Sequence, residues 1–338
     1  MRVASLDVAR GIGIFLLVLG HNNLLKENAP KLFAAVSTFR VPLFFLLSGA
    51  FLPESISRSF IGLRFGIFIR PFLVGVLLAL PLQLMDLSHP VNDWFPVDVF
   101  WATGNSIMNA PLWFLSSMIV AMCIMHVIDE LGLADKHVLY LGFALFVSGM
   151  WLLSMPEVVG HLPKDKLGRI WGLPWSLDLG PISAGLMISG RGLADLLKKP
   201  WQGARLEGAL LILFGTIFML AFTTGAPALD LNNRIAVNMV ALLLCTLSGI
   251  GMMISLSRCL TRLDGAWIAV VQRFGAASLV VLICHWPLQQ VFIRVLKRLG
   301  HNAEADLLIS ILTCVLIYFF AERVLVSRPV LRKMFMGR

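Results

Sequence analysis

Residues 6 to 25 read LDVARGIGIFLLVLGHNNLL, an apolar stretch that contains three charge-capable side chains, Asp7, Arg10 and His21. A run of about 20 mostly apolar residues is long enough to span a bilayer as one helix. Ionisable groups at membrane depth are costly, so they usually face a bundle interior or a wet cavity and mark a functional site. The stretch therefore predicts a membrane-spanning fold with a polar site inside it.

The spacing of these side chains places them on one side of the predicted helix. His21 follows Arg10 by eleven positions, and eleven steps of about 100° end within roughly 20° of three full turns. The two residues then lie about 16 Å apart along the axis, and Asp7 lies roughly 60° from Arg10. One helix thus presents a polar stripe from its start to its far end.

The composition of the whole chain agrees with a membrane fold. Of 338 residues, 58% are hydrophobic and only 14% are charged, and the mean hydropathy is +0.84. A soluble domain is nearer a quarter charged. We therefore expect an all-α, polytopic transmembrane bundle that forms a single domain over residues 1–338. The net charge of +9 does not indicate nucleic-acid binding, because most Lys and Arg residues fall in short loops, as membrane topology requires.

Ten apolar segments predict ten membrane spans, of which the sixth is interrupted by Pro174 and Pro181. Their approximate bounds are 4–25, 34–52, 60–84, 111–128, 138–155, 173–190, 207–225, 235–256, 274–296 and 306–326. If the N-terminus is cytoplasmic, 18 of the 28 Lys and Arg residues fall in inside segments and 10 in outside segments. Cytoplasmic loops carry an excess of Lys and Arg, so this bias favours both termini in the cytoplasm.

Two other features of the chain exclude alternative classes. Five single cysteines show neither metal-ligand spacing nor a disulfide framework, so we interpret them as small core residues and expect no metal site. The start of the chain resembles a signal peptide, but no clear small-x-small cleavage site follows its apolar region. We therefore expect this segment to remain as the first span.

His21 and Arg10 are the leading candidates to carry chemistry. A neutral imidazole can take a proton from a hydroxyl group or accept an acyl group, and a guanidinium can stabilise an anion. The alternatives are a histidine satisfied by hydrogen bonds at the outer interface and an arginine that extends to the cytoplasmic headgroups. Asp7 lies too far along the helix to contact His21, so any partner of His21 must come from another span.

Residues of other spans are further candidates to line the site. His285 lies in mid-span and needs a partner or water, and Pro287 interrupts the backbone hydrogen bonds one turn earlier. Ser48 is a small polar residue that permits close helix approach. For Trp113 the alternative is an interfacial aromatic belt. For Glu322 the alternative is a simple ion pair with an arginine.

Three arginines, Arg58, Arg64 and Arg70, follow the second span at intervals of six residues. Each interval is about 240° on a helix, so one straight helix would splay the three side chains. They suit phosphate groups only if the chain bends, for which Pro71 is available. The alternative is ordinary positive charge on the cytoplasmic side.

Taken together, four segments resemble the acyltransferase-3 family of integral membrane acyltransferases. They are LDVARGIGIFLLVLGH at 6–21, FRVPLFFLLSG at 39–49, LWFL at 112–115 and FGAASLVVLICHWPL at 274–288. They run from the first span to the ninth in the family's order, so the resemblance covers essentially the whole chain. The opening GIGIFLLVLGHN is most similar to the branch named for fucose O-acetylases.

The resemblance implies a bundle of about ten helices in the bacterial inner membrane that moves an acyl group from acyl-CoA, most often acetyl-CoA, to a hydroxyl of a carbohydrate or lipid-linked glycan. By position, Arg10 and His21 match the family's essential arginine–histidine pair. The family places two basic residues three apart after the second span. Here Arg64 and Arg70 are six apart and position 67 is Ile67, which departs from that pattern.

The resemblance leads to a specific hypothesis for the reaction and its residues. Acyl-CoA is expected as a co-substrate rather than a bound cofactor, with Arg10 and the arginines after the second span at its anionic part. His21 would act as general base or carry the acyl group. The competing hypothesis is a transporter or a lipid or glycan flippase, in which the same buried polar groups line a path and no bond is made. The sequence does not specify the acceptor sugar, the acyl chain length or the oligomeric state.

Overall fold

The computed structural model describes residues 3–21, 27–84, 95–164, 168–199, 203–263, 265–300 and 304–337. Within these residues the chain is almost entirely helical, with one two-stranded hairpin. Eight helical segments are long and apolar enough to cross a membrane: Pro30–Gly49, Arg58–Leu84, Ala110–Glu130, Asp135–Leu153, Ala204–Gly225, Met239–Leu260, Ser278–Arg298 and Leu307–Leu325. They correspond to eight of the ten predicted spans, and the all-α membrane fold is confirmed.

The first and sixth predicted spans form shorter helices. Helix α1 (Ala4–Gly20) has 17 residues, about 25 Å at 1.5 Å per residue. The sixth segment begins as a 3-10 turn, η2 (Pro174–Leu179), and only its second part, α10 (Gly180–Gly192), is an α-helix. Trp175 and Ser176 have φ values of 59° and 56°, in the left-handed region that a regular helix excludes. The total of ten spans remains a prediction.

The ninth predicted span starts later than expected. Residues 266–276 form a separate helix, α14 (Ala266–Ala276), and α15 (Ser278–Arg298) begins after a break at Ala277. Helix α14 packs against α1 so closely that a side chain at Gly275 would collide with the backbone of Asp7. A glycine is therefore required at this crossing.

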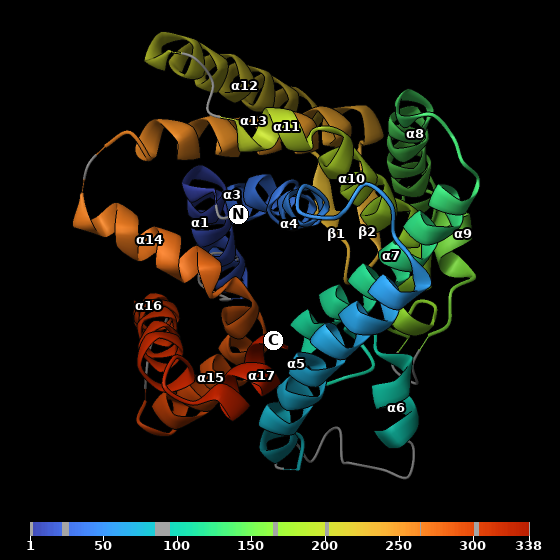
Figure 1. Ribbon diagram of the computed structural model, residues 1–338. Coiled ribbons are helices and arrows are strands. Elements are labelled where there is room, and N and C mark those ends of the chain that lie inside the picture. Colours follow the sequence, from blue (N-terminus) through green and yellow to red (C-terminus); the bar gives the residue numbers. More distant parts are fainter. Residues whose placement is uncertain are drawn as a thin grey trace.

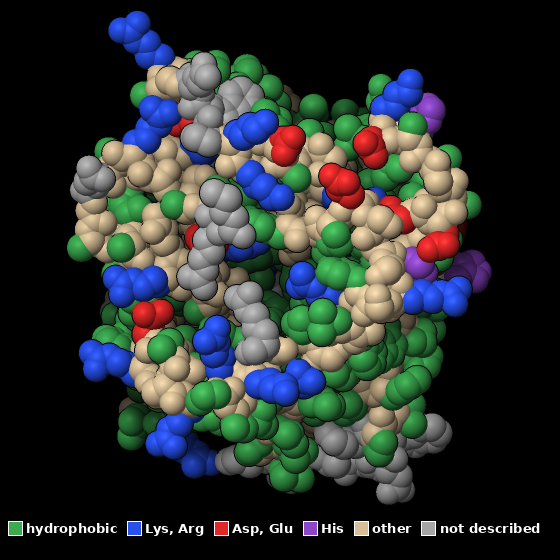
Figure 2. Space-filling view, in the orientation of Figure 1, with side chains coloured by type: hydrophobic (Ala, Val, Ile, Leu, Met, Phe, Trp, Pro, Cys, Tyr) green, Lys and Arg blue, Asp and Glu red, His purple; other side chains and the backbone are tan. Residues whose placement is uncertain are grey.

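Helix α1 lies inside the bundle. It contacts α4 (Arg40–Gly49), α13 (Met239–Leu260), α14, α15 and α16 (Glu304–Phe319), and Figure 1 shows it surrounded by these helices. Helix α12 (Ala204–Gly225) lies at the rim and exposes large apolar side chains such as Ile212 and Leu220, as a lipid-facing helix would. The face of the molecule in Figure 2 carries many Lys and Arg side chains and fewer Asp and Glu.

A proline inside α15 frees a helix carbonyl, and a neighbouring side chain pairs with it. Proline has no amide N–H, so the carbonyl four residues earlier loses its helical partner. Pro287 frees the carbonyl of Ile283, which accepts a 2.9 Å hydrogen bond from Nδ2 of Asn109. This bond lets α15 continue through Pro287 while the bundle satisfies its backbone. At the junction of α3 and α4, Oγ1 of Thr246 donates a 2.9 Å hydrogen bond to the carbonyl of Thr38, the C-cap residue of α3.

The remaining elements connect the long helices. The hairpin strands Ala228–Asp230 (β1) and Ile235–Val237 (β2) pair antiparallel. The other helices are α3 (Pro30–Ser37), α5 (Arg58–Leu84), α6 (Phe95–Trp101), η1 (Ala110–Leu112), α7 (Trp113–Glu130), α8 (Asp135–Leu153), α9 (Pro156–Gly160), α11 (Ala194–Lys198), η3 (Phe320–Leu325) and α17 (Pro329–Met336). Cys245 and Cys314 are buried, whereas Cys123 is exposed, so the interpretation of every cysteine as a core residue is wrong for Cys123.

Candidate functional site

A cavity of about 460 Å³ opens beside the first half of α1, and we call it the Arg10 cavity. Its polar lining comes from four helices that are far apart in the sequence. The polar lining residues are Asp7 and Arg10 of α1, Ser48 of α4, Arg64 of α5, and Ser278 at the start of α15. The predicted site residues Asp7, Arg10, Ser48 and Arg64 are therefore brought together around one hollow.

Arg10 has several contacts within this cavity. Its Nη1 lies 3.3 Å from Oδ1 of Asp7, and its Nη2 donates to the carbonyl of Leu47 at 3.4 Å. The guanidinium also lies over the ring of Phe51, 4.6 Å from the ring centroid. Asp7 therefore balances the charge of Arg10 within the same helix, at the wall of the cavity.

Of the three spaced arginines, only Arg64 lines the Arg10 cavity. Helix α5 continues unbroken through Pro71, so the six-residue spacing splays the side chains. Arg58 is exposed at the start of the helix, and Arg70 donates to the carbonyl of Gly337 at 3.3 Å. Arg58 and Arg70 therefore do not line the Arg10 cavity with Arg64, and their binding of acyl-CoA stays a prediction.

A second cavity, of about 270 Å³, lies at the other end of α1, and we call it the His21 cavity. His21 is the residue that caps the helix. Around it lie Arg40 at the start of α4, the buried Trp113 at the start of α7, and polar residues of the hairpin, Asp230, Asn232 and Asn233. The predicted candidates His21 and Trp113 thus share one cavity, and the burial of Trp113 excludes its interpretation as an interfacial residue.

His285 packs directly against His21. The two ring centroids are 5.2 Å apart and the rings are tilted by 46°. His285 is fully buried, and its Nδ1 lies 2.8 Å from the carbonyl oxygen of Val281. A carbonyl only accepts hydrogen bonds, so Nδ1 carries the proton and Nε2 carries the lone pair. Nε2 has no hydrogen-bond partner among the described residues, so it can accept a proton from a neighbour.

The two cavities adjoin along one face of α1. Asp7, Arg10, Ile14 and Leu17 line the Arg10 cavity, and Leu17, Gly20 and His21 line the His21 cavity. This succession follows the three- and four-residue steps of one helix face. The wall common to both cavities is apolar and consists of Leu17, Val41, Phe114 and Leu282.

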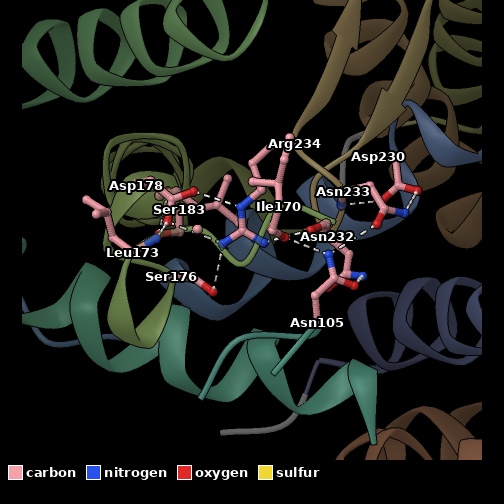
Figure 3. A network of polar contacts seen from close by, with 12 residues as sticks. Asn105, Ile170, Leu173, Ser176, Asp178, Ser183, Asp230, Asn232, Asn233 and Arg234 are labelled. Atoms are coloured by element: carbon pink, nitrogen blue, oxygen red, sulfur yellow. Dashed lines mark hydrogen bonds and ion pairs between the residues drawn. The ribbon is translucent and has the colours of Figure 1, made fainter. Parts of the chain in front are cut away.

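The hairpin is held over the His21 cavity by the polar network in Figure 3. The side chain of Arg234 is fully buried, and its Nε and Nη2 lie 2.8 and 3.2 Å from the two carboxylate oxygens of Asp178 in η2. Nδ2 of Asn105 donates to Oδ1 of Asn233, and Nδ2 of Asn232 donates to Oδ1 of Asn105, both at 3.3 Å. This network positions the hairpin side chains that face His21.

The remaining candidate, Glu322, lies at neither cavity. It lines a smaller cavity of about 240 Å³ with Arg273 and Arg332, and its Oε2 is 3.9 Å from Nη1 of Arg273. The simple ion pair is therefore the interpretation that the contacts favour. Conversely, Arg40 and the hairpin residues were not predicted as site residues. Nothing in the sequence links Asp230 to His21, because they are far apart in the chain.

Comparison with known proteins gives one match. The model of a protein family described as an acyltransferase domain matches residues 3–322. No curated protein and no solved structure matches the chain. The matched range includes α1 and every residue that lines the two cavities.

Proposed function

The chain belongs to the acyltransferase-3 family of integral membrane acyltransferases, and from that premise we propose that it moves an acyl group from acyl-CoA to a hydroxyl of a carbohydrate or lipid-linked glycan. The protein is a multi-pass membrane acyltransferase that transfers groups other than aminoacyl groups. The proposal adds acetyl-CoA as the donor, O-acetylation as the reaction and the bacterial inner membrane as the location. Both termini are proposed to be cytoplasmic.

One observation carries the proposal: a single face of α1 presents Arg10 to one cavity and His21 to another, and the two cavities share a wall. With both termini in the cytoplasm, as proposed, the Arg10 cavity lies toward the cytoplasm and receives acyl-CoA. Arg10 and Arg64 attract the anionic part of the donor, since arginine is well suited to phosphate groups. The acceptor enters the His21 cavity from the outer side.

The transfer requires the acyl group to reach His21 past the shared wall of Leu17, Val41, Phe114 and Leu282. The acceptor hydroxyl oxygen forms a bond to the acyl carbonyl carbon, and a ring nitrogen of His21 takes the hydroxyl proton. The carbon–sulfur bond of the thioester then breaks, and the thiolate of CoA takes that proton to become the free thiol.

His21 has two possible roles, and His285 takes part in the first of them. In direct transfer, His21 is the general base, and the ring of His285, whose Nε2 has no hydrogen-bond partner among the described residues, packs against it. In the two-step route, His21 carries the acyl group before the hydroxyl attacks. Membership of an acyltransferase family favours either route over the transporter, in which no bond would be made.

The decisive experiment measures covalent transfer by the purified protein. In detergent, radiolabelled acetyl-CoA and a panel of methyl glycosides should give free CoA and label on the glycoside, and neither should form without protein. Mass spectrometry of surface polysaccharide from a deletion strain identifies the natural acceptor as the species that loses acetyl groups. Absence of CoA release with every acceptor, together with glycan uptake into sealed vesicles, would establish the transporter instead.

A further inference from the structure

Arg40 is a cation that lines the same cavity as His21. It is the first residue of α4, and its guanidinium lies against Gly20, the residue before His21. Any side chain at position 20 would overlap that guanidinium, so the glycine creates the space that Arg40 fills.

The hydrogen-bonding capacity of Arg40 is largely unused. A guanidinium has five N–H donors, and among the described residues Arg40 makes one hydrogen bond, from Nη1 to the carbonyl of Leu16 at 3.2 Å. The ring of Phe33 lies 5.3 Å from its central carbon. Asp230 interacts with Arg40 electrostatically, but its two carboxylate oxygens accept hydrogen bonds from Asn233 at 3.0 and 2.7 Å. Donors therefore remain to face a bound group.

Arg10 lies too far from His21 to interact with a group bound beside it. The two residues are eleven positions apart on α1, which is about 16 Å along the axis, and Arg10 lines the other cavity. It is also already paired with Asp7. A negative charge that forms beside His21 therefore has Arg40, not Arg10, as its nearby cation.

We infer that Arg40 is a catalytic residue that stabilises the oxyanion formed when the acceptor hydroxyl attacks the acyl carbonyl; this inference rests on the proposed acyl transfer. As the new carbon–oxygen bond forms, the carbonyl π electrons move onto oxygen, and the free N–H groups of Arg40 donate to that oxygen. An electron pair on that oxygen then re-forms the C=O bond as the carbon–sulfur bond breaks, and the negative charge leaves with the thiolate. Donors held in place before the reaction stabilise such a charge without reorganisation.

The test compares Arg40→Ala and Arg40→Lys with the matched control Arg294→Gln. Arg294 also donates one hydrogen bond to a backbone carbonyl, that of Leu82 at 3.3 Å, but it does not line the His21 cavity. Arg40→Ala should lower kcat for acetyl transfer to methyl glycosides by about 10²–10³-fold, the usual effect of losing one oxyanion donor. The KM values should stay within about twofold, Arg40→Lys should retain part of the activity, and Arg294→Gln should behave as the unaltered protein.

Chemical rescue separates catalysis from a structural role. Guanidinium chloride, added to Arg40→Ala below denaturing concentrations, should restore part of kcat because the free cation enters the vacated space. No restoration in a variant with an unchanged melting temperature would overturn the assignment, as would a raised acceptor KM with unchanged kcat. If the unaltered protein releases no CoA, the proposed function and this assignment both fall. Full turnover by Arg40→Ala overturns the role of Arg40 alone.

Discussion

The Arg10 cavity and the His21 cavity lie along one face of α1, yet their charges are balanced differently. Arg10 finds its counterion, Asp7, three residues away in the same helix. Arg40 instead shares its cavity with Asp230, which a hairpin far along the chain brings there. The first arrangement forms with the helix itself, whereas the second exists only after the bundle has assembled. The Arg10 cavity therefore suits binding of the charged acyl-CoA. In the His21 cavity, N–H groups of Arg40 can stay available for a reacting group.

The largest expected effect comes from removing the base from the His21 cavity. Without the imidazole, the acceptor hydroxyl keeps its proton, and general-base catalysis contributes about 10²–10⁴-fold. His21→Ala should therefore reduce kcat for acetyl transfer by that factor while the protein still elutes as a folded species. His161→Ala is the matched control, since His161 is exposed and lies at neither cavity. Normal turnover by His21→Ala would remove His21 from the mechanism.

The shared wall offers the next largest effect. Val41 borders both cavities, so Val41→Trp should block passage of the acyl group between them. We expect transfer to fall about 10²-fold, the scale of a misplaced reacting group, while acetyl-CoA binding measured by isothermal titration changes little. Val240→Trp controls for the added volume, because Val240 is 75% exposed on α13. Equal transfer by the two variants would show that the acyl group does not cross at this wall.

Removing the charge of Arg10 should change the KM for acetyl-CoA rather than kcat. Arg10→Gln should raise the KM for acetyl-CoA about tenfold or more, since hydrogen bonds to charged groups contribute about 1.5–3 kcal/mol. The variant Arg10→Gln/Asp7→Asn removes both charges, and its melting temperature should exceed that of Arg10→Gln, which leaves Asp7 without its partner. A fall in kcat with an unchanged KM would place Arg10 at the reacting atoms instead.

Substitution of Asn109 tests whether its hydrogen bond to Ile283 stabilises α15. Asn109→Leu leaves the carbonyl of Ile283 without a partner and should lower the free energy of unfolding by about 1–3 kcal/mol. Adding Pro287→Ala restores the amide N–H that reaches Ile283, so the double variant should regain part of this loss. Thermal melts in detergent measure both changes. Strictly additive losses in the double variant would contradict this pairing.

The smallest effect should distinguish the three arginines of α5. Arg64→Gln should raise the KM for acetyl-CoA about two- to fivefold, because a partly exposed charge contact contributes about 0.2–1 kcal/mol. Arg58→Gln and Arg70→Gln serve as controls on the same helix and should leave this KM unchanged. An equal rise in all three variants would indicate a diffuse electrostatic effect rather than a contact inside the Arg10 cavity.

The helical period of α1 accounts for the part of the site that the sequence predicts correctly. The eleven-position spacing of Arg10 and His21 predicts a shared face, and the cavities lie along that face. Burial and packing decided the remainder. The spacing of Arg58, Arg64 and Arg70 gave no reason to choose among them, and the choice of Arg64 depends on how α5 packs against α7 and α15.

The amino-acid sequence alone determined that this chain is a helical membrane protein with a polar stripe on its first helix, because hydrophobic length and helical period are local properties. Tertiary structure alone decided that His285 packs against His21, that Gly20 makes room for Arg40, and that Asp230 closes the same cavity. These contacts join residues far apart in the chain. Their geometry follows from helix crossings and from the buried Arg234–Asp178 pair, which no local pattern encodes.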